Sequence, residues 1–256
     1  MLLVNISLNA LLDDLKALGL SEGDKVLVHT SLSKVGMVEG GPKGFVSAIA
    51  KTVGKSGLAV FPTLTGTPED SASKPPYFDV RNSPCWTGKV PEAARVYPGA
   101  IRSLHPTHSV AVIGSKAKEL VNGHEFSDTP CGEQSPYGIL AKSGGKILLV
   151  GVNHDSNTTF HTAEEYAKSP FHMLELPALA TIVDYSGEAR KISVHLHRWG
   201  TERDFNLLEE QFIAKGIEKI GTIGKATCRL IESGPMIEII LEALRKDPYY
   251  LVVNGK

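Results

Sequence analysis

Short apolar runs alternate with helix-like stretches along this chain, and they predict a sheet whose strands are joined by helices. The runs at 25–29 and 58–62 have the length of buried strands. Between them, the segment from Pro42 to about Val53 is predicted to be a helix, because proline is favoured in the first turn of a helix. The order strand, helix, strand favours parallel pairing and an α/β fold.

The same pattern predicts elements on both sides of this unit. Ser7 can cap a helix that carries leucines on one face and ends at Gly19. Apolar runs at 179–185 and 191–197 flank a Ser-Gly turn and predict a β-hairpin. We therefore expect a three-layer α/β/α fold with a central mixed, largely parallel sheet, an added hairpin in the C-terminal half, and a single domain over residues 1–256. Further strands are predicted at 110–114, 146–152 and within 217–231, and further helices near 90–97, 115–122, 135–142, 204–216 and 234–246.

Residues 63–89 form a long segment without predicted secondary structure. They are rich in proline, serine, threonine and glycine, with aromatic residues interspersed. A segment this long inside a compact domain is usually a functional or a mobile loop. It follows a core strand, which is the side of an α/β sheet where ligands bind. We therefore interpret it as a packed loop on the substrate side, with a plain linker as the alternative.

The segment 153–165 carries the most informative polar residues of the chain. It follows the apolar run at 146–152, so a buried strand delivers it to the edge of the sheet. On the helix predicted there, Glu164 and Glu165 lie three and four residues after His161 and share its face. A carboxylate beside a histidine orients the ring and stabilises the imidazolium, as a general base requires. A solvated acidic helix face on which His161 only packs is the alternative.

Two more polar clusters lie at predicted strand ends. Residues 29–41, HTSLSKVGMVEGG, place hydroxyl residues and glycines between a strand and a helix, where backbone N–H groups can hold a phosphate or a thioester-bearing cofactor. This cluster matches neither GxxxxGK[ST] nor GxGxxG, and a plain strand-to-helix turn is equally compatible with it. Residues 102–109, RSLHPTHS, include Arg102, whose guanidinium can pair with a phosphate through two hydrogen bonds.

A different chemistry is suggested by histidines in the second and third clusters. His105 and His108 could join His154 and His161 as ligands of a metal-dependent hydrolase. The chain lacks HExxH and any other compact ligand motif, so we expect no metal and keep this class as the alternative. The absence of GxSxG gives no support to a serine hydrolase.

Composition and charge exclude several classes. The chain has 256 residues, of which 42% are hydrophobic, and a formal net charge of −1 with no basic run, so we expect no nucleic-acid partner. No apolar run reaches the length of a membrane span, and the N-terminus lacks the basic region of a signal peptide, so we expect no membrane partner. Three cysteines without a CxxC pair argue against a disulfide framework and favour the cytoplasm.

Taken in order, these clusters resemble the aminoglycoside 3-N-acetyltransferase family, which is distinct from the GNAT acetyltransferases. The resemblance covers nearly the whole chain. It implies transfer of an acetyl group from acetyl-coenzyme A to the 3-amino group of a cationic aminoglycoside antibiotic, by direct attack in a ternary complex, and hence antibiotic resistance. Another small amine metabolite is the alternative acceptor, and a non-catalytic protein that binds coenzyme A or a polyamine is a third reading. The matching stretches are HTSLSKVGMVEGG (29–41), FPT (61–63), GKVPEAARVYPGAIRSLHPTHSVAVIG (88–114), QSPYGIL (134–140), GGKILLVGVNHDSNTTFHTAEE (144–165) and FIAKGIEKIGTIGKATCRLIES (212–233).

The resemblance implies roles for individual residues. His161 matches the general base of the family and Glu164 the acidic position of its motif. His29 would lie near the thioester, and Asp204 is the candidate for a downstream acidic residue. Four carboxylates are expected to attract the cationic acceptor because of their charge: Asp79, Asp155, Glu165 and Glu164. The chain is expected to be a monomer or a homodimer. The coenzyme A side is implied for Thr30, Ser31, Leu32, Ser33, Val35, Gly36, Arg102, Ser103, Pro106 and Thr107.

Overall fold

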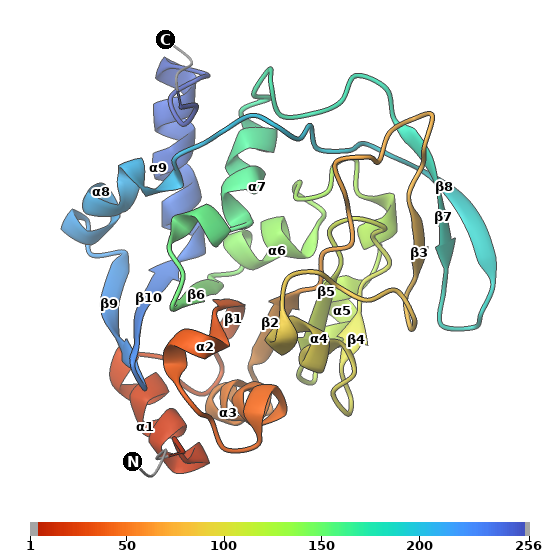
Figure 1. Cartoon of the computed structure of the whole chain (residues 1–256). Coiled ribbons are helices and arrows are strands. Elements are labelled where there is room, and N and C mark those ends of the chain that lie inside the picture. The colour runs from red at the N-terminus through yellow and green to blue at the C-terminus, as the bar shows by residue number, and fades with distance from the viewer. Residues whose placement is uncertain (1–4, 254–256) are drawn as a thin grey trace.

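The computed structural model describes residues 5–253, which build a seven-stranded mixed sheet and a smaller three-stranded sheet (Figure 1). The large sheet has the order β4-β5-β2-β1-β6-β10-β9. The expected α/β fold with a mixed sheet is confirmed, and its parallel pairs are β2 with β1 and β1 with β6. The other four pairs, β4 with β5, β5 with β2, β6 with β10 and β10 with β9, are antiparallel, so the expectation of a largely parallel sheet is wrong. Only the three central strands are joined by the connections that parallel pairing needs. The strands are β1 (Lys25–Thr30), β2 (Leu58–Pro62), β4 (Ile101–Arg102), β5 (Val110–Ile113), β6 (Lys146–Val150), β9 (Glu218–Ile223) and β10 (Ala226–Glu232).

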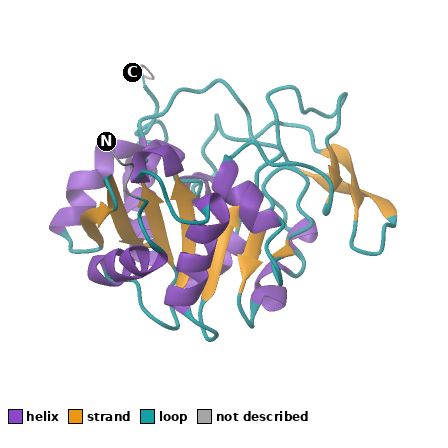
Figure 2. Cartoon of the chain, turned by 60° about the horizontal axis from the view of Figure 1, so that its bottom comes forward, coloured by secondary structure: helices purple, strands orange, loops and turns teal. Residues whose placement is uncertain are grey.

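Helices cover both faces of this sheet (Figure 2). Alternate residues of the buried strand β1 point to opposite sides, so Val26 and Val28 pack with α1, α3 and α4, while Leu27 packs with α5 and α6. Among residues 5–253, none of the helices has both the length and the apolar character needed to cross a bilayer. The helices are α1 (Leu8–Leu18), α2 (Leu32–Val35), α3 (Gly41–Val53), α4 (Lys89–Arg95), α5 (Ala117–Val121), α6 (Pro136–Lys142), α7 (Thr159–Tyr166), α8 (Glu209–Ala214) and α9 (Ser233–Lys246), with short 3₁₀ turns η1 (His124–Phe126), η2 (His154–Ser156) and η3 (Phe205–Leu208).

The smaller sheet contains the predicted hairpin and one strand that the sequence did not reveal. β7 (Ala178–Val183) and β8 (Ala189–Val194) pair antiparallel, which confirms the hairpin with shorter strands than expected. β3 (Tyr77–Asp79), from the long segment 63–89, adds to β7 in parallel. The interior of this sheet is apolar and includes the fully buried Phe78. The segment is therefore packed, as expected, and does not act as a linker.

One buried arginine joins the two sheets. The backbone N–H of Arg102, on β4, donates to the hydroxyl of Tyr185 in the hairpin turn at 2.6 Å. Its guanidinium lies 4.7 Å from the centre of the Phe78 ring on β3 and donates to the carbonyl oxygen of Ser83 at 2.6 Å. Arg102 therefore connects the small sheet to the edge of the large one, beside Leu104, which packs against the interior of the small sheet.

Candidate active site

A cavity of about 420 Å³ lies at the carboxyl ends of the three parallel strands. This is the edge of an α/β sheet at which ligands usually bind. His29 and Thr30 line it from the end of β1, and Pro62 lines it from the end of β2. The remaining walls come from residues within 64–70, 86–91, 107–108, 152–161 and 196–205, together with His172. Segments that are far apart in the sequence thus meet around one space.

α7 holds a histidine and a glutamate against each other at the cavity wall. His161 lines the cavity, and its Nδ1 lies 2.7 Å from Oε2 of Glu164, one turn further along the helix. Oε1 of Glu164 accepts a hydrogen bond from Nε of Arg203 at 2.6 Å. Because Glu164 engages Nδ1, the lone pair of His161 lies on Nε2, where it can accept a proton from a bound substrate.

Glu164 keeps its negative charge although it is buried. Burial by itself favours the neutral acid, but the hydrogen bond with His161 and the charges of His161, His172 and Arg203 outweigh it and lower the pKa of Glu164 to about 2. A fixed carboxylate stabilises the imidazolium that forms when His161 accepts a proton. The pair has the arrangement that general base catalysis needs.

His29 is held neutral at the end of β1. Burial disfavours its charged form, and His154 and His161 add repulsion, so the pKa of His29 falls to about 3. Its Nε2 and the hydroxyl of Thr30 are buried and have no hydrogen-bond partner among residues 5–253. Two neighbouring polar groups without partners at a cavity wall can bind a polar group of a substrate.

Two histidines that sequence reasoning did not assign to the site, His172 and His197, also line the cavity, as does His108, which was expected only as a ligand in the alternative metal site. The ring centroids of His172 and His197 lie 4.1 Å apart, and they lie 5.1 and 5.0 Å from that of His161. Both residues are on irregular segments between α7 and η3. His197 lies within the strand predicted at 191–197, but β8 ends at Val194, so the predicted strand gave no signal that its histidine turns toward the cavity.

Glu165 does not face the cavity, which corrects the expectation that it attracts a cationic acceptor. It is buried, and it binds the Thr129 hydroxyl, the Cys131 backbone N–H at 2.9 Å and Nε2 of His197 at 2.6 Å. Burial, with a smaller contribution from Glu164, outweighs these hydrogen bonds and raises the pKa of Glu165 to about 8. A carboxyl group that is neutral at pH 7 has no attraction for a cation.

The pKa of Glu165 predicts a measurable pH dependence of stability. Unfolded Glu165, with an ordinary pKa of 4.5, is ionised at pH 7, whereas the folded protein keeps the proton up to about pH 8. The folded state therefore binds more protons, and the free energy of unfolding falls as the pH rises through this interval. We expect the natural chain to lose about 1 kcal/mol more between pH 7 and 8 than Glu165→Gln, whose amide mimics the neutral acid.

Urea titrations of both chains at pH 7 and 8 measure this difference. EDTA is included in both titrations because the histidines around Glu165 could bind a metal ion, which would change the measured stability. Equal losses of stability in the two chains would show that Glu165 is already ionised at pH 7.

Arg102 is not available to a phosphate, contrary to expectation. Its side chain is 2% exposed, and its guanidinium is already saturated by protein acceptors. Nε donates to the hydroxyls of Thr63 and Ser109 at 3.1 and 3.0 Å, and the terminal nitrogens donate to backbone carbonyls. Burial lowers the pKa of Arg102 to about 10, which still leaves it charged. Its role is to hold the two sheets together.

The other residues expected on the coenzyme A side fall into two groups. Thr30 and Thr107 line the cavity, whereas most of the others contribute to the fold. Ser103 is buried and its Oγ lies 2.8 Å from Nδ1 of His124, so it does not face a ligand. Val35 is fully buried in the core, and Gly36, with φ of 114°, turns the chain after α2. Pro106 is buried. Ser31, Leu32 and Ser33 form the turn after β1, beside the cavity, and they are half-buried or exposed.

The acidic residues are placed differently from the expectation. Asp155 lines the cavity, as does Asp70, which sequence reasoning missed. Asp79 lies outside the cavity, because its carboxylate accepts hydrogen bonds from two backbone N–H groups and closes a turn. Asp204 also lies outside it and caps η3. Aspartate is favoured at such turns and caps, so its charge alone did not show whether it attracts a substrate or closes a turn.

The four histidines of the alternative metal site do not come together. His154 is fully buried, and its Nε2 lies 3.0 Å from Oε2 of Glu218, away from the cavity. The ring of His105 is buried and stacks on His124 with centroids 4.7 Å apart. Within residues 5–253, none of the groups of potential metal ligands contains His105, or joins His154 to His161.

The chain is similar to known proteins over nearly its whole length. A family model described as aminoglycoside 3-N-acetyltransferase matches residues 27–245. Aminoglycoside N(3)-acetyltransferase VIII of Streptomyces fradiae is 32% identical in an alignment covering 91% of this chain and 89% of the relative.

Solved structures show the same fold. A variant of aminoglycoside acetyltransferase AAC(3)-IVa in complex with gentamicin superposes with a TM-score of 0.83 at 30% identity, covering 98% of this chain and 93% of that one. AAC-IIIb in a binary complex with CoASH gives a TM-score of 0.82 at 28% identity, with coverage of 94% and 96%. The fold that surrounds the cavity is thus that of proteins crystallised with a coenzyme and with an antibiotic.

Proposed function

Because this chain belongs to the aminoglycoside 3-N-acetyltransferase family, we propose that it transfers an acetyl group from acetyl-coenzyme A to the 3-amino group of an aminoglycoside and so confers resistance. The observation that carries the proposal is the His161–Glu164 pair. It places a ring nitrogen that can accept a proton on the cavity wall, and a carboxylate on the other side of the ring. Nothing in this reaction requires a covalent acyl-enzyme.

The reaction begins with removal of a proton from the acceptor. An ammonium group has no lone pair, so it must lose a proton before it attacks a thioester. Nε2 of His161 takes this proton, and Glu164 stabilises the resulting imidazolium. The free amine attacks the thioester carbonyl, a C–N bond forms and the C–S bond breaks. The nitrogen gives up its second proton as the amide forms, the thiolate takes one proton and leaves as the thiol, and the imidazolium of His161 returns the proton that remains to water.

Two groups at the end of β1 suit the developing oxyanion. Nε2 of neutral His29 and the hydroxyl of Thr30 are buried, have no partner among residues 5–253, and belong to residues of the cavity wall. Donors that are already desolvated lose little on binding the transition state. Coenzyme A lies along the turn formed by Ser31, Leu32 and Ser33, with Thr107 opposite.

The acceptor binds against the carboxylates of the wall. Asp70 and Asp155 lie there, and they attract a cationic sugar in a manner that salt weakens. Arg198 and Arg203 line the same cavity and offset part of this charge. A smaller amine metabolite is the second candidate acceptor, because it needs fewer carboxylates than a polycationic antibiotic does.

The test is release of free thiol from acetyl-coenzyme A in the presence of a panel of aminoglycosides and simple amines. We expect turnover with 2-deoxystreptamine antibiotics and a product that NMR identifies as acetylated at the 3-amino group. Turnover restricted to simple amines would replace the acceptor and keep the reaction. Binding of both ligands without thiol release would contradict the enzyme proposal itself.

The proposal includes the setting in which the chain works. It acts as a single domain, residues 1–256, and as a monomer or homodimer. Its cysteines Cys85, Cys131 and Cys228 are free thiols, which suits the reducing cytoplasm. Light scattering on the purified chain measures its oligomeric state.

A further inference from the structure

Three histidines lie close together around the cavity, and only His161 has a role in the proposed acetyl transfer. One ring nitrogen from each of His161, His172 and His197 lies within 4.8 Å of the corresponding atoms of the other two. All three side chains line the cavity, so an ion from solution can reach them. Imidazole nitrogens are preferred ligands of Zn²⁺ and related transition metals.

Each ring has one nitrogen next to a carboxylate, which leaves the other nitrogen available. Nδ1 of His161 lies 2.7 Å and Nδ1 of His172 lies 3.2 Å from Oε2 of Glu164. Nε2 of His197 lies 2.6 Å from Oε1 of Glu165. The ionised Glu164 fixes the tautomer and increases the basicity of the His161 ring, as carboxylates behind metal-binding histidines do, and the carboxyl group of Glu165 holds the His197 ring in place.

The ring of His172 has one nitrogen without a partner in the described part of the chain. Its side chain is 1% exposed, and its Nε2 is buried without a hydrogen-bond partner among residues 5–253. Buried polar atoms in native proteins are nearly always paired, so an unpaired nitrogen beside two other imidazoles points to an absent partner. Arg203 lies 3.2 Å from Nδ1 of His172, but Glu164 balances its charge at 2.6 Å.

We propose that His161, His172 and His197 form a binding site for a divalent transition-metal ion of the Zn²⁺ type. Zn–N bonds of about 2.1 Å place the ligand nitrogens of a tetrahedral site about 3.3 Å apart. Starting from within 4.8 Å, small rotations of the side chains close this gap. The fourth position faces the cavity and takes water, and Glu164 accepts the Nδ1 proton of His161.

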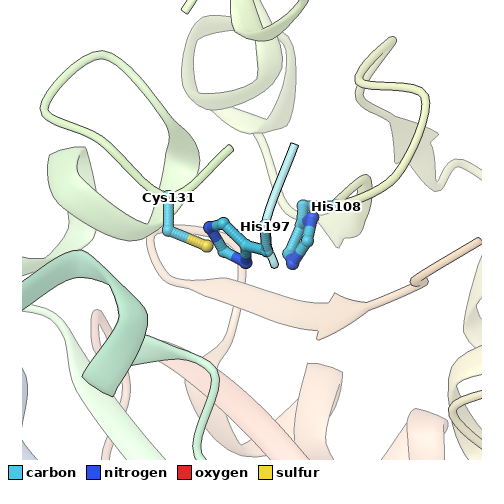
Figure 3. A group of neighbouring side chains, drawn as sticks. All are labelled: His108, Cys131 and His197. Carbon is cyan, nitrogen blue, oxygen red and sulfur yellow. The ribbon is translucent and has the colours of Figure 1, made fainter. Parts of the chain in front are cut away.

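Two other groups of potential ligands are less suitable. Figure 3 shows Cys131, His197 and His108 side by side, with the thiol directed toward the His197 ring. Cys131 is fully buried and does not line the cavity, and burial with nearby Glu165 and Glu164 raises the pKa of its thiol, so the thiolate that binds metal is disfavoured.

The third group already holds a cation of the protein. It consists of His154, Glu209 and Glu218. Nε of Arg229 lies 2.9 Å from Oε2 of Glu209 and 3.5 Å from Oε1 of Glu218. A metal ion would have to displace this guanidinium, so the three-histidine group is the better site.

Metal bound at this site has a consequence for the proposed transfer reaction, and this part rests on the proposed function. A metal on Nε2 of His161 occupies the lone pair that accepts the proton. We therefore expect Zn²⁺ to inhibit acetyl transfer reversibly, and EDTA to restore it.

Calorimetric titration of Zn²⁺ into the untagged, chelator-treated full chain tests the site without reference to activity. We expect one bound ion per chain, and an affinity at least tenfold lower in His172→Ala and in His197→Ala. His195→Ala is the matched control, because His195 is exposed and belongs to none of the ligand groups. The visible absorption of a Co²⁺ form reports the nitrogen ligation directly.

The outcomes separate the two proposals. Zinc binding that depends on His172 and His197 in a chain without transferase activity supports the site and not the reaction. Unchanged affinity in both variants, or an equal loss in His195→Ala, overturns the site. Circular dichroism identifies a variant that does not fold, and the other variant then decides.

Discussion

Replacing His161 with alanine is expected to lower kcat for acetyl transfer by about 10²–10⁴-fold, the usual contribution of a positioned general base. The expectation follows from the 2.7 Å contact with Glu164 and from the location of the ring on the cavity wall. Affinity for acetyl-coenzyme A is expected to stay nearly unchanged, because His161 acts on the amine. Thiol-release kinetics and calorimetry with coenzyme A measure the two quantities.

Controls distinguish lost chemistry from lost structure. His195→Ala removes an exposed histidine and should leave kcat unchanged. Added imidazole should restore part of the rate in His161→Ala, because a small base can enter the space left by the ring. A His161→Ala enzyme that turns over at a nearly normal rate would contradict the assignment of the base.

Glu164→Gln is expected to have the second large effect, in two separable ways. The neutral amide cannot stabilise the imidazolium of His161, so kcat should fall by about 10²-fold or more. The change also leaves the guanidinium of Arg203 without its partner at 2.6 Å. Breaking a buried ion pair in this way costs about 3 kcal/mol of unfolding free energy.

Arg203→Met is the comparison for this variant. It breaks the same ion pair, but it leaves the carboxylate of Glu164 on Nδ1 of His161. We expect a similar loss of stability by urea denaturation and a smaller loss of kcat. Equal losses of kcat in the two variants would indicate that Glu164 contributes structure and not charge.

The parts of the site that the sequence predicted depend on local spacing. The three-residue interval between His161 and Glu164 places them one turn apart on any helix, and the structure has them in contact. The apolar runs that became β1, β2 and β6 are buried strands, and their ends meet at the cavity. These inferences needed only helix geometry and the rule that parallel strands end at one edge.

The remaining parts depend on contacts between distant segments. Glu165 follows Glu164 directly, but a helix turns by about 100° per residue, and Glu165 meets Thr129, Cys131 and His197. Arg102 has the side chain that phosphate sites use, but it is buried among carbonyls and hydroxyls of other segments. Residue type shows what a side chain can bind and not what surrounds it.

The anchoring of the small sheet through Arg102 has an evolutionary consequence. Arg102 holds the cavity rim between β2 and β3 at Ser83 and Phe78, and β2 holds its other end, whereas His161 lies on α7. Insertions, deletions and substitutions within 66–76 can therefore accumulate without moving the base. A lineage can acquire new acceptors by altering this rim while α7 keeps its sequence.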